Sequence, residues 1–366
     1  MRYVTAHPFT VAAYAVAALI AIAVPAVGST YLVSLFTLVL ITALLATSVN
    51  MPAGEAGLVS MGHAGISAAA AYGIAYGVKH DFGLGGQLLL ALLLTVIVSA
   101  VFGLTTMRTN GIVFLMITLA LGVMVYGIAL KWSAVTGGQS GLTGINRPAA
   151  LSDGRTYYYA VLALCVIVIL LLQMLARSPF GLMTRGVRDN ENRMASLGYS
   201  IAPVKFVTVM VSGLVAGLAG VLLVWHSEFM SPASAAFDKS AMAVVIIIIG
   251  GVGTVAGPLL GSVLVVGVQF WLSSYVERWP TLLGLLFIAV VILLPGGLAS
   301  IATRGRRAGR PAFHPAIRKV LAPLIARAGS DPAPAPSRAE PGRNTPQDPL
   351  GSTPIRGPEQ HDERTP

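Results

Sequence analysis

The chain has 366 residues, of which 55% are hydrophobic and only 10% are charged. No soluble core requires so large an apolar fraction, so composition excludes a soluble globular protein and indicates an all-α protein that crosses a membrane several times. The net charge of +10 does not indicate nucleic-acid binding, because 11 of the 24 Lys and Arg residues lie after Thr303. The single cysteine, Cys165, excludes a disulfide framework.

Apolar runs long enough to cross a bilayer recur along the chain. The first is followed at once by a second run, so we expect it to be a retained helix and not a cleaved signal. Ten apolar segments divide into two sets of five. Because five is an odd number of membrane crossings, the two sets would run in opposite directions through the membrane, which predicts two inverted halves. The ten predicted segments are 9–27, 30–49, 62–78, 86–106, 110–130, 156–176, 206–226, 240–252, 258–276 and 281–295.

The tryptophans support one orientation of these segments. With the N-terminus inside, the basic stretch 177–206 and the C-terminus are predicted to lie in the cytoplasm, in keeping with the preference of Lys- and Arg-rich loops for that side. All four tryptophans then fall near the outer ends of their spans, as an interfacial aromatic belt requires. They are Trp132, Trp225, Trp271 and Trp279.

The third and eighth segments are interrupted by glycine and proline. Such interruptions at corresponding positions of inverted halves predict a translocation path. Small residues that allow helices to cross closely are the alternative explanation. The residues concerned are Asn50, Gly54, Glu55, Gly57, Ser60, Gly62 and His63 in the first stretch and Gly250, Gly251, Gly253, Gly257 and Pro258 in the second.

Three polar residues of the first stretch each have two interpretations. His63 is either a hydrogen-bonded structural residue or a substrate contact. Ser60 is either a helix cap or a pathway residue. Glu55 either remains hydrated at the cytoplasmic mouth, which we favour, or lines the pathway and binds the cationic end of an amino acid.

The stretch 177–206 is polar and basic between two apolar runs. Residues 187–197 lack glycine and proline and are followed by Gly198, which predicts a short helix from Val187 to Leu197. An ordinary loop that only sets topology is the alternative.

Beyond residue 302 the composition changes to Pro, Arg, Gly and acidic residues, which predicts a mostly disordered tail over 303–366. Within it, Phe313 to Ala328 has the spacing of a short helix on the inner membrane surface, or is merely part of the tail. The permease domain is therefore predicted to span 1–302.

Motifs of soluble enzymes are absent from the sequence. No GxxxxGK[ST], HExxH or CxxC pattern occurs, and the six histidines are scattered. We therefore predict no catalytic residues, no metal site and no ATP hydrolysis by a P-loop in this chain.

Four separated motifs resemble the permease subunits of ATP-binding-cassette (ABC) importers for branched-chain amino acids, of the type II importer fold. The first contains Asn50, Gly54, Gly57 and Gly62-His63-Ala64; the others are Thr136 to Ile145, the Arg177 to Gly198 stretch, and Gly250 to Gly261. This resemblance covers nearly all of residues 30–300. It differs from the family pattern at Glu55, where a neutral residue is usual, and at Asn192-Arg193, where small residues are usual.

The resemblance implies roles for residues at both membrane faces. Arg185, Arg188, Glu191, Leu197 and Gly198 would couple the chain to two cytoplasmic ATPase subunits, which bind the ATP and magnesium. Gly137, Gly138, Ser140 and Gly141 would lie in a loop that meets an external solute-binding protein; an undocked, flexible loop is the alternative.

The resemblance also implies a second permease subunit, a different paralogous chain, and a location in the cytoplasmic or inner membrane with the C-terminus inside. The cargo would be a branched-chain amino acid or a related solute such as urea or an amide. A stand-alone secondary transporter or channel is the alternative function; such proteins commonly carry a network of membrane-embedded acids and bases, and apart from Glu55 this sequence offers none.

Overall fold

The computed structural model describes residues 21–23, 25, 28–273, 281–282, 284–285, 287–288, 292 and 297–298. By its internal contacts the chain divides into two units, Met1–Ala308 and Gly309–Pro366, and all described residues belong to the first. The predicted tail 303–366, its Phe313 to Ala328 helix and Trp279 lie outside the described residues, as does most of the first predicted span.

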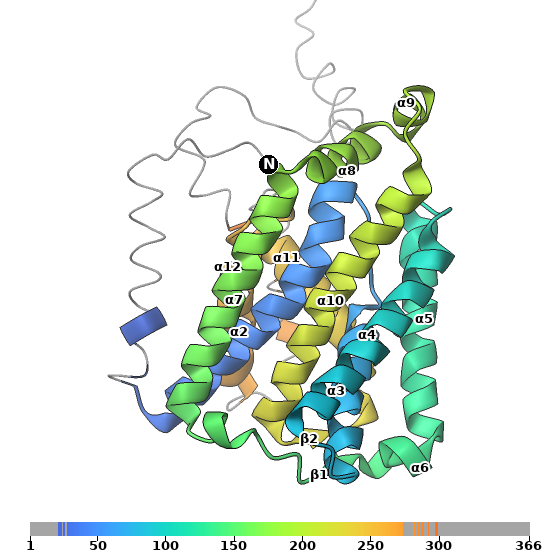
Figure 1. Ribbon diagram of the computed structural model, residues 1–366. Helices are drawn as coiled ribbons and strands as arrows, with labels where there is room; N and C mark the ends of the chain where they lie inside the picture. The colour runs from blue at the N-terminus through green and yellow to red at the C-terminus, as the bar shows by residue number, and fades with distance from the viewer. Residues whose placement is uncertain are drawn as a thin grey trace, which may run out of the picture. The chain divides into compact units, whose positions relative to one another are not determined.

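The described part is a helical bundle (Figure 1). Its larger helices occupy eight of the ten predicted apolar segments. They are α2 (Thr30–Met51), α3 (His63–Lys79), α4 (Leu84–Thr106), α5 (Gly111–Lys131), α7 (Gly154–Arg177), α10 (Ile201–Ser227), α11 (Phe237–Gly250) and α12 (Gly257–Ser273).

Five of these helices are long and apolar enough to cross a membrane: α2 with its extension to Ala56, α4, α5, α7 and α10. α12 is a shorter apolar helix of 17 residues, and α3 and α11 have 17 and 14 residues. The described residues therefore form a polytopic membrane-embedded bundle, and they do not extend far enough to count all ten predicted spans.

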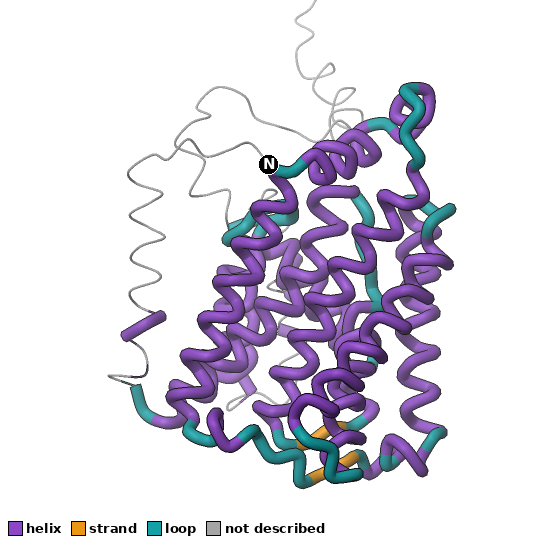
Figure 2. The backbone as a smooth tube through the Cα atoms, in the orientation of Figure 1, coloured by secondary structure: helices purple, strands orange, loops and turns teal. Residues whose placement is uncertain are grey.

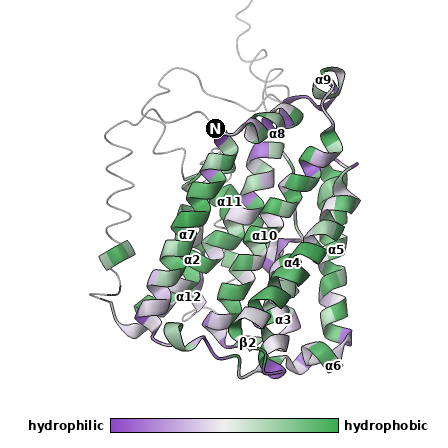
Figure 3. Cartoon of the chain, viewed as in Figure 1, coloured by the Kyte–Doolittle hydropathy of each residue, from purple (hydrophilic) through white to green (hydrophobic). Residues whose placement is uncertain are grey.

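Burial separates an inner from an outer set of helices. α2, α3 and α10 are mostly buried, and α10 packs against α2, α3 and α4. α4, α5 and α7 instead expose large apolar side chains such as Leu89, Ile112 and Met174. Figure 3 shows these outer helices as predominantly hydrophobic along their length. Exposed apolar faces of this kind are what a lipid environment requires.

The two ends of the bundle carry different short elements (Figure 2). At one end α8 (Pro179–Asp189) and α9 (Glu191–Ser196) lie across the helices; we call this the α8 end. At the other, the hairpin end, β1 (Leu142–Thr143) pairs antiparallel with β2 (Phe229–Met230), with Leu142 opposite Met230. The elements around them are α6 (Ser133–Thr136), η2 (Gly138–Ser140), η3 (Ala149–Leu151) and η4 (Pro232–Ala235).

The tryptophans that the structure describes agree with this polarity. Trp132 follows the last residue of α5, Trp225 lies near the end of α10 and Trp271 near the end of α12. α5 and α10 both finish at the hairpin end, next to the strand pair. Three aromatic residues near helix ends are consistent with the predicted interfacial belt.

The predicted helix from Val187 to Leu197 is wrong in its bounds. Ser178 is extended and Pro179 occupies the first helical position, so α7 stops and α8 begins earlier than predicted. α8 then ends at Asp189, and extended Asn190 separates it from α9, whose Arg193 N–H it caps with its side chain at 2.9 Å. The local capping preference of asparagine interrupts a run whose composition alone favoured one helix.

Candidate functional site

The chain does not run as one continuous helix from the second predicted span into the third. α2 passes into a single π-helical turn, η1 (Pro52–Ala56), which ends at Gly57 with a positive φ of 71°. A non-helical segment follows, and α3 begins only at His63. Because Pro52 lacks an N–H and Gly57 readily adopts the left-handed conformation, this sequence favours a break at that point.

The second predicted stretch is broken in the same way. α11 ends at Gly250, Gly251 and Gly253 have φ of 112° and 73°, and α12 starts at Gly257-Pro258. A side chain on Gly250 would collide with the backbone of Gly257, so the two helix ends approach closely here. Both interruptions predicted from glycine and proline are therefore present.

The two breaks lie against each other. The Asn50 side-chain amide donates to the Thr254 carbonyl oxygen at 2.9 Å and accepts from the Gly253 N–H at 2.8 Å. A Cβ on Gly54 would collide with the Gly253 Cα, so the backbones are in direct contact. Residues about 200 positions apart thus form one junction, as expected if they belong to a common site.

His63 is enclosed in a hydrogen-bonded group. Its Nδ1 lies 2.9 Å from the Ser60 Oγ and its Nε2 2.8 Å from the Ser212 Oγ, and the residue is 1% exposed. With both ring nitrogens occupied by the protein, the geometry favours the structural interpretation of His63. Ser60 is also buried, and its Oγ accepts from the Gly62 N–H at 3.4 Å, although Gly62 and not Ser60 is the N-cap of α3.

Gly62 itself is held by packing. A side chain there would collide with the Phe102 ring and the Thr118 carbonyl oxygen, and Thr118 also accepts a hydrogen bond from the Met61 N–H at 3.2 Å. The glycine thus lets the non-helical segment pack closely against α4 and α5. Close packing, which was the alternative to a role in the translocation path, therefore accounts for the presence of glycine at positions 54 and 62.

Glu55 is buried, contrary to the expectation that it would be hydrated. Its side chain is 7% exposed, and its Oε2 lies 3.3 Å from the Arg185 Nε on α8. Arg185 also donates to the Gly181 and Ala176 carbonyl oxygens at 2.9 and 2.5 Å. The expectation was wrong because α8 packs against η1 and supplies a cation that makes burial of the carboxylate tolerable.

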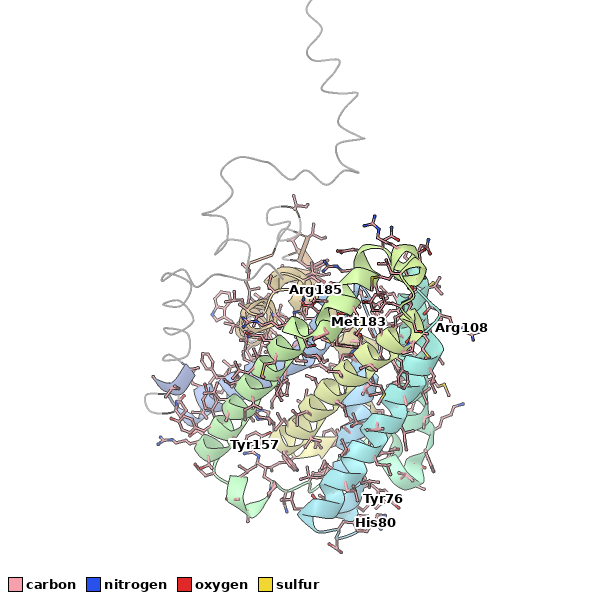
Figure 4. All side chains as sticks on the ribbon, turned by 45° about the horizontal axis from the view of Figure 1, so that its top comes forward. Tyr76, His80, Arg108, Tyr157, Met183 and Arg185 are labelled. Atoms are coloured by element: carbon pink, nitrogen blue, oxygen red, sulfur yellow. The ribbon has the colours of Figure 1, made fainter. Side chains whose placement is uncertain are left out.

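Arg188 forms a second contact between α8 and η1. Its Nη1 donates to the Gly54 carbonyl oxygen at 2.5 Å, and a Cβ on Gly57 would lie 2.8 Å from the Arg188 Cγ. Figure 4 shows Arg185 and Met183 on α8 at the end of the bundle that also carries Arg108. Two arginines predicted to couple this chain to an ATPase are thus engaged with the interrupted segment of their own chain.

A cavity of about 40 Å³ lies beside this junction, lined by Asn50, Glu55, Gln173 and Gly253 among others. That volume accommodates a few water molecules but not an amino acid.

Glu191 lies in a second polar group at the α8 end. Its Oε1 is 2.5 Å from the Lys205 Nζ, and its Oε2 accepts from the Asn110 side-chain amide. The Lys205 side chain is 2% exposed and also donates to Asn110 Oδ1 and, at 3.3 Å, to the Thr109 carbonyl oxygen. Through these contacts Glu191 links α9 to Asn110 in the α4–α5 turn and to Lys205 of α10. Leu197 and Gly198 follow α9 and are exposed.

The predicted docking loop is ordered against its own chain. Gly137, Gly138 and Gly141 have positive φ, and a side chain on Gly141 would collide with the Met230 carbonyl oxygen of β2. Ser140 is exposed at the hairpin end. Arg147, further along the same connection, donates to the Trp225 and His226 carbonyl oxygens at 2.6 and 3.1 Å. The loop is thus held in place without a partner.

Several residues of the site were not predicted from the sequence. Ser212 and Ser240 are single serines within apolar helices, and Ser240 Oγ accepts from the Ala64 N–H at 3.1 Å. Lys205 and Asn110 stand at the starts of spans, where a polar residue suggests only the membrane interface. Nothing in the local sequence pairs these residues with His63 or Glu191. Among the described residues, no group of three potential metal ligands occurs.

The fold and the site define a polytopic helical membrane protein with two interrupted helices in contact and a peripheral helix docked on one of them. Residues 31–295 match the family model described as branched-chain amino acid transport system / permease component, and the chain belongs to this family. The resemblance drawn from the four motifs is thereby confirmed.

Curated relatives agree with the family match. The chain is 29% identical over 284 residues to the high-affinity branched-chain amino acid transport system permease protein LivM of Salmonella typhimurium, covering 70% of this chain and 67% of that protein. The LivM protein of Escherichia coli is 28% identical over the same coverage. A probable LivM protein of Methanocaldococcus jannaschii is 26% identical over 55% of this chain and 59% of its own length. No solved structure matches the chain.

Proposed function

We propose that this chain is the membrane-spanning permease subunit of an ABC importer that carries branched-chain amino acids or a related small polar solute such as urea or an amide. The observation that carries the proposal is the family match over residues 31–295. The names of the LivM relatives support the branched-chain cargo.

The permease domain, residues 1–302, contains ten spans in two inverted sets of five. The interrupted segments on either side of the Asn50–Gly253 contact form the translocation path, and the contact between them supports a path at the junction of the two halves. The α8 end faces the cytoplasm of a cell whose inner membrane holds the protein, and the tail 303–366 lies on the same side. The concentration of arginines in α8 and α9 supports this orientation.

Each end of the bundle meets a partner. At the hairpin end the ordered loop around Ser140 receives a solute-binding protein. At the α8 end two ATPase subunits, which bind ATP and magnesium, contact α8 and α9, with exposed Leu182 and Leu197 available to them. A second, paralogous permease subunit completes the path. The chain itself contributes no catalytic residue and binds no cofactor, so it performs transport by changing conformation.

Purification and reconstitution test this function. We expect an affinity-tagged chain, expressed in its native cell, to bring down an ATP-binding subunit and a second permease. In liposomes the complex should accumulate labelled leucine only when ATP is present on the α8 side and the binding protein on the other. Leucine uptake by the purified chain alone, driven by an ion gradient, would instead identify a secondary transporter.

A further inference from the structure

Both arginines of α8, Arg185 and Arg188, contact η1 of their own chain. The Arg185 side chain is 14% exposed and contacts Gly181, Ala176 and Glu55. We propose that Glu55 and Arg185 form a positioning pair that makes η1 follow α8, so that movement imposed on α8 reaches the translocation path. This inference rests on the proposed function and assigns the step between the ATPase contact and the path.

Burial is the reason the two segments would move together. The Glu55 side chain is 7% exposed with α8 in place, and a movement of α8 alone would separate its carboxylate from its counter-ion. An unpaired charge in a poorly hydrated interior costs far more than one at the surface, so displacement of the two segments as one body is favoured. The Arg188–Asp189 pair on the same helix differs, because its side chains are 38% and 69% exposed and water can replace either partner.

A second attachment restricts how η1 can turn. Arg188 donates to the Gly54 carbonyl oxygen, one residue before Glu55, and its side chain packs against Gly57 just beyond η1. The single π-helical turn is therefore held by one ion pair and one charge-assisted hydrogen bond, both from α8.

From η1 the connection continues into the other interrupted segment. Gly54 packs directly on Gly253, and Asn50, at the end of α2, is hydrogen-bonded to Gly253 and Thr254. A shift of η1 must therefore displace the loop between α11 and α12 or break these contacts. Arg185 on α8 pairs with Glu55 of η1, and η1 packs on Gly253. These contacts connect the peripheral helix α8 to both interrupted segments.

The experiment uses the complete complex in proteoliposomes, with leucine and the binding protein supplied outside. Leucine uptake and ATP hydrolysis are measured on the same vesicles for wild type, Glu55→Gln, Arg185→Gln and the double variant. Asp81→Asn is the matched control, because it removes an exposed carboxylate from the turn between α3 and α4. The amount of assembled complex is determined for each variant.

We expect Arg185→Gln to lower leucine transported per ATP hydrolysed by about tenfold or more, because it leaves a buried carboxylate unpaired. Glu55→Gln, which is isosteric, should lower the ratio less. The double variant should transport more leucine per ATP than Arg185→Gln, since no buried charge remains. Asp81→Asn should keep the wild-type ratio. A purely structural role would reduce the amount of assembled complex and leave the ratio unchanged.

Three results would overturn the inference: a wild-type ratio in both single variants, a double variant in which the two losses simply multiply, or equal loss in Asp81→Asn. If Arg185→Gln does not assemble, Glu55→Gln decides alone, and a wild-type ratio in it rejects the pair. Failure of the wild-type complex to couple ATP to uptake would reject the proposed function and the pair with it, whereas a coupled wild type with unaffected variants rejects only the pair.

Discussion

Asn50 and Gly253, 203 positions apart, are joined by a 2.8 Å hydrogen bond from the Gly253 N–H to the Asn50 side-chain oxygen. The same side chain donates to Thr254. One amide therefore satisfies a donor and an acceptor of a loop whose backbone is irregular. Such irregular backbone at membrane depth requires partners from the protein, because lipid offers none.

The first prediction concerns this amide. Asn50→Asp removes the donor to Thr254 and brings a second oxygen toward its carbonyl, at an expected cost of about 1–3 kcal/mol in stability. We expect a lower thermal unfolding temperature in detergent and uptake reduced by at least about tenfold. Asn192→Asp, at an exposed position of α9, is the control and should unfold at the wild-type temperature. Equal unfolding temperatures for both variants would contradict the role given to Asn50.

The second prediction concerns the close approach of Gly54 to Gly253. Gly54→Ala inserts a methyl group where the opposite backbone lies, and backbone cannot move aside as a flexible side chain can. We expect a destabilisation of about 1–3 kcal/mol, with loss of transport. Gly127→Ala is matched in chemistry, but its methyl group meets no atom within 4 Å. It should fold and transport normally; if Gly54→Ala does so too, the backbones are not in contact in the membrane.

His63 provides the third prediction. Because its ring nitrogens are bonded to Ser60 and Ser212, His63→Leu should remove one hydrogen bond from each of two buried hydroxyls and cost about 2 kcal/mol. The KM for uptake by the fraction that remains assembled should stay at the wild-type value. Ser212→Ala should show the same pattern more weakly. A large rise in KM for His63→Leu, with stability retained, would mean that the histidine contacts the solute.

The fourth prediction concerns Glu191 and Lys205. Replacing Glu191 by Arg places two cations together where Lys205 is 2% exposed, and removing one partner of a buried ion pair typically costs about 3–5 kcal/mol. We expect Glu191→Arg to release α9, seen as faster proteolysis after Arg193, and to fold poorly.

The companion variant Glu191→Gln should be milder, since its amide oxygen can still accept from Lys205. Adding Lys205→Met to Glu191→Gln removes the remaining buried charge and should restore the unfolding temperature toward wild type. If Glu191→Arg folds and resists protease as wild type does, the carboxylate acts at a partner surface and not within the chain.

The fifth prediction tests orientation. Cys165 is 3% exposed, so cysteines introduced elsewhere can be labelled selectively. Ser140→Cys at the hairpin end should react with a membrane-impermeant maleimide in intact cells. Leu197→Cys, 66% exposed near α9, should react only after the cells are opened. The reverse pattern would invert the topology and remove the basis for an ATPase contact at α8.

The sequence determined the class of protein and the positions of its helices. Eight apolar segments predicted from hydropathy became helices, because the free energy of placing apolar residues in lipid is a sum over local sequence. The two interruptions were also local, since Pro52 lacks an N–H and Gly57, Gly251 and Gly253 adopt a positive φ that other residues rarely take. The four motifs were sufficient for the family.

Only the tertiary structure decided how the polar residues pair. Glu55 looked hydrated because its partner, Arg185, is 130 positions away, and Glu191 looked free to meet another subunit because nothing nearby indicated Lys205 and Asn110. Which charge neutralises which depends on how the helices fold together, and burial then makes those choices energetically large. Hydropathy thus specified which residues enter the membrane. Contacts between distant parts of the chain determined how the few buried charged residues of the protein pair.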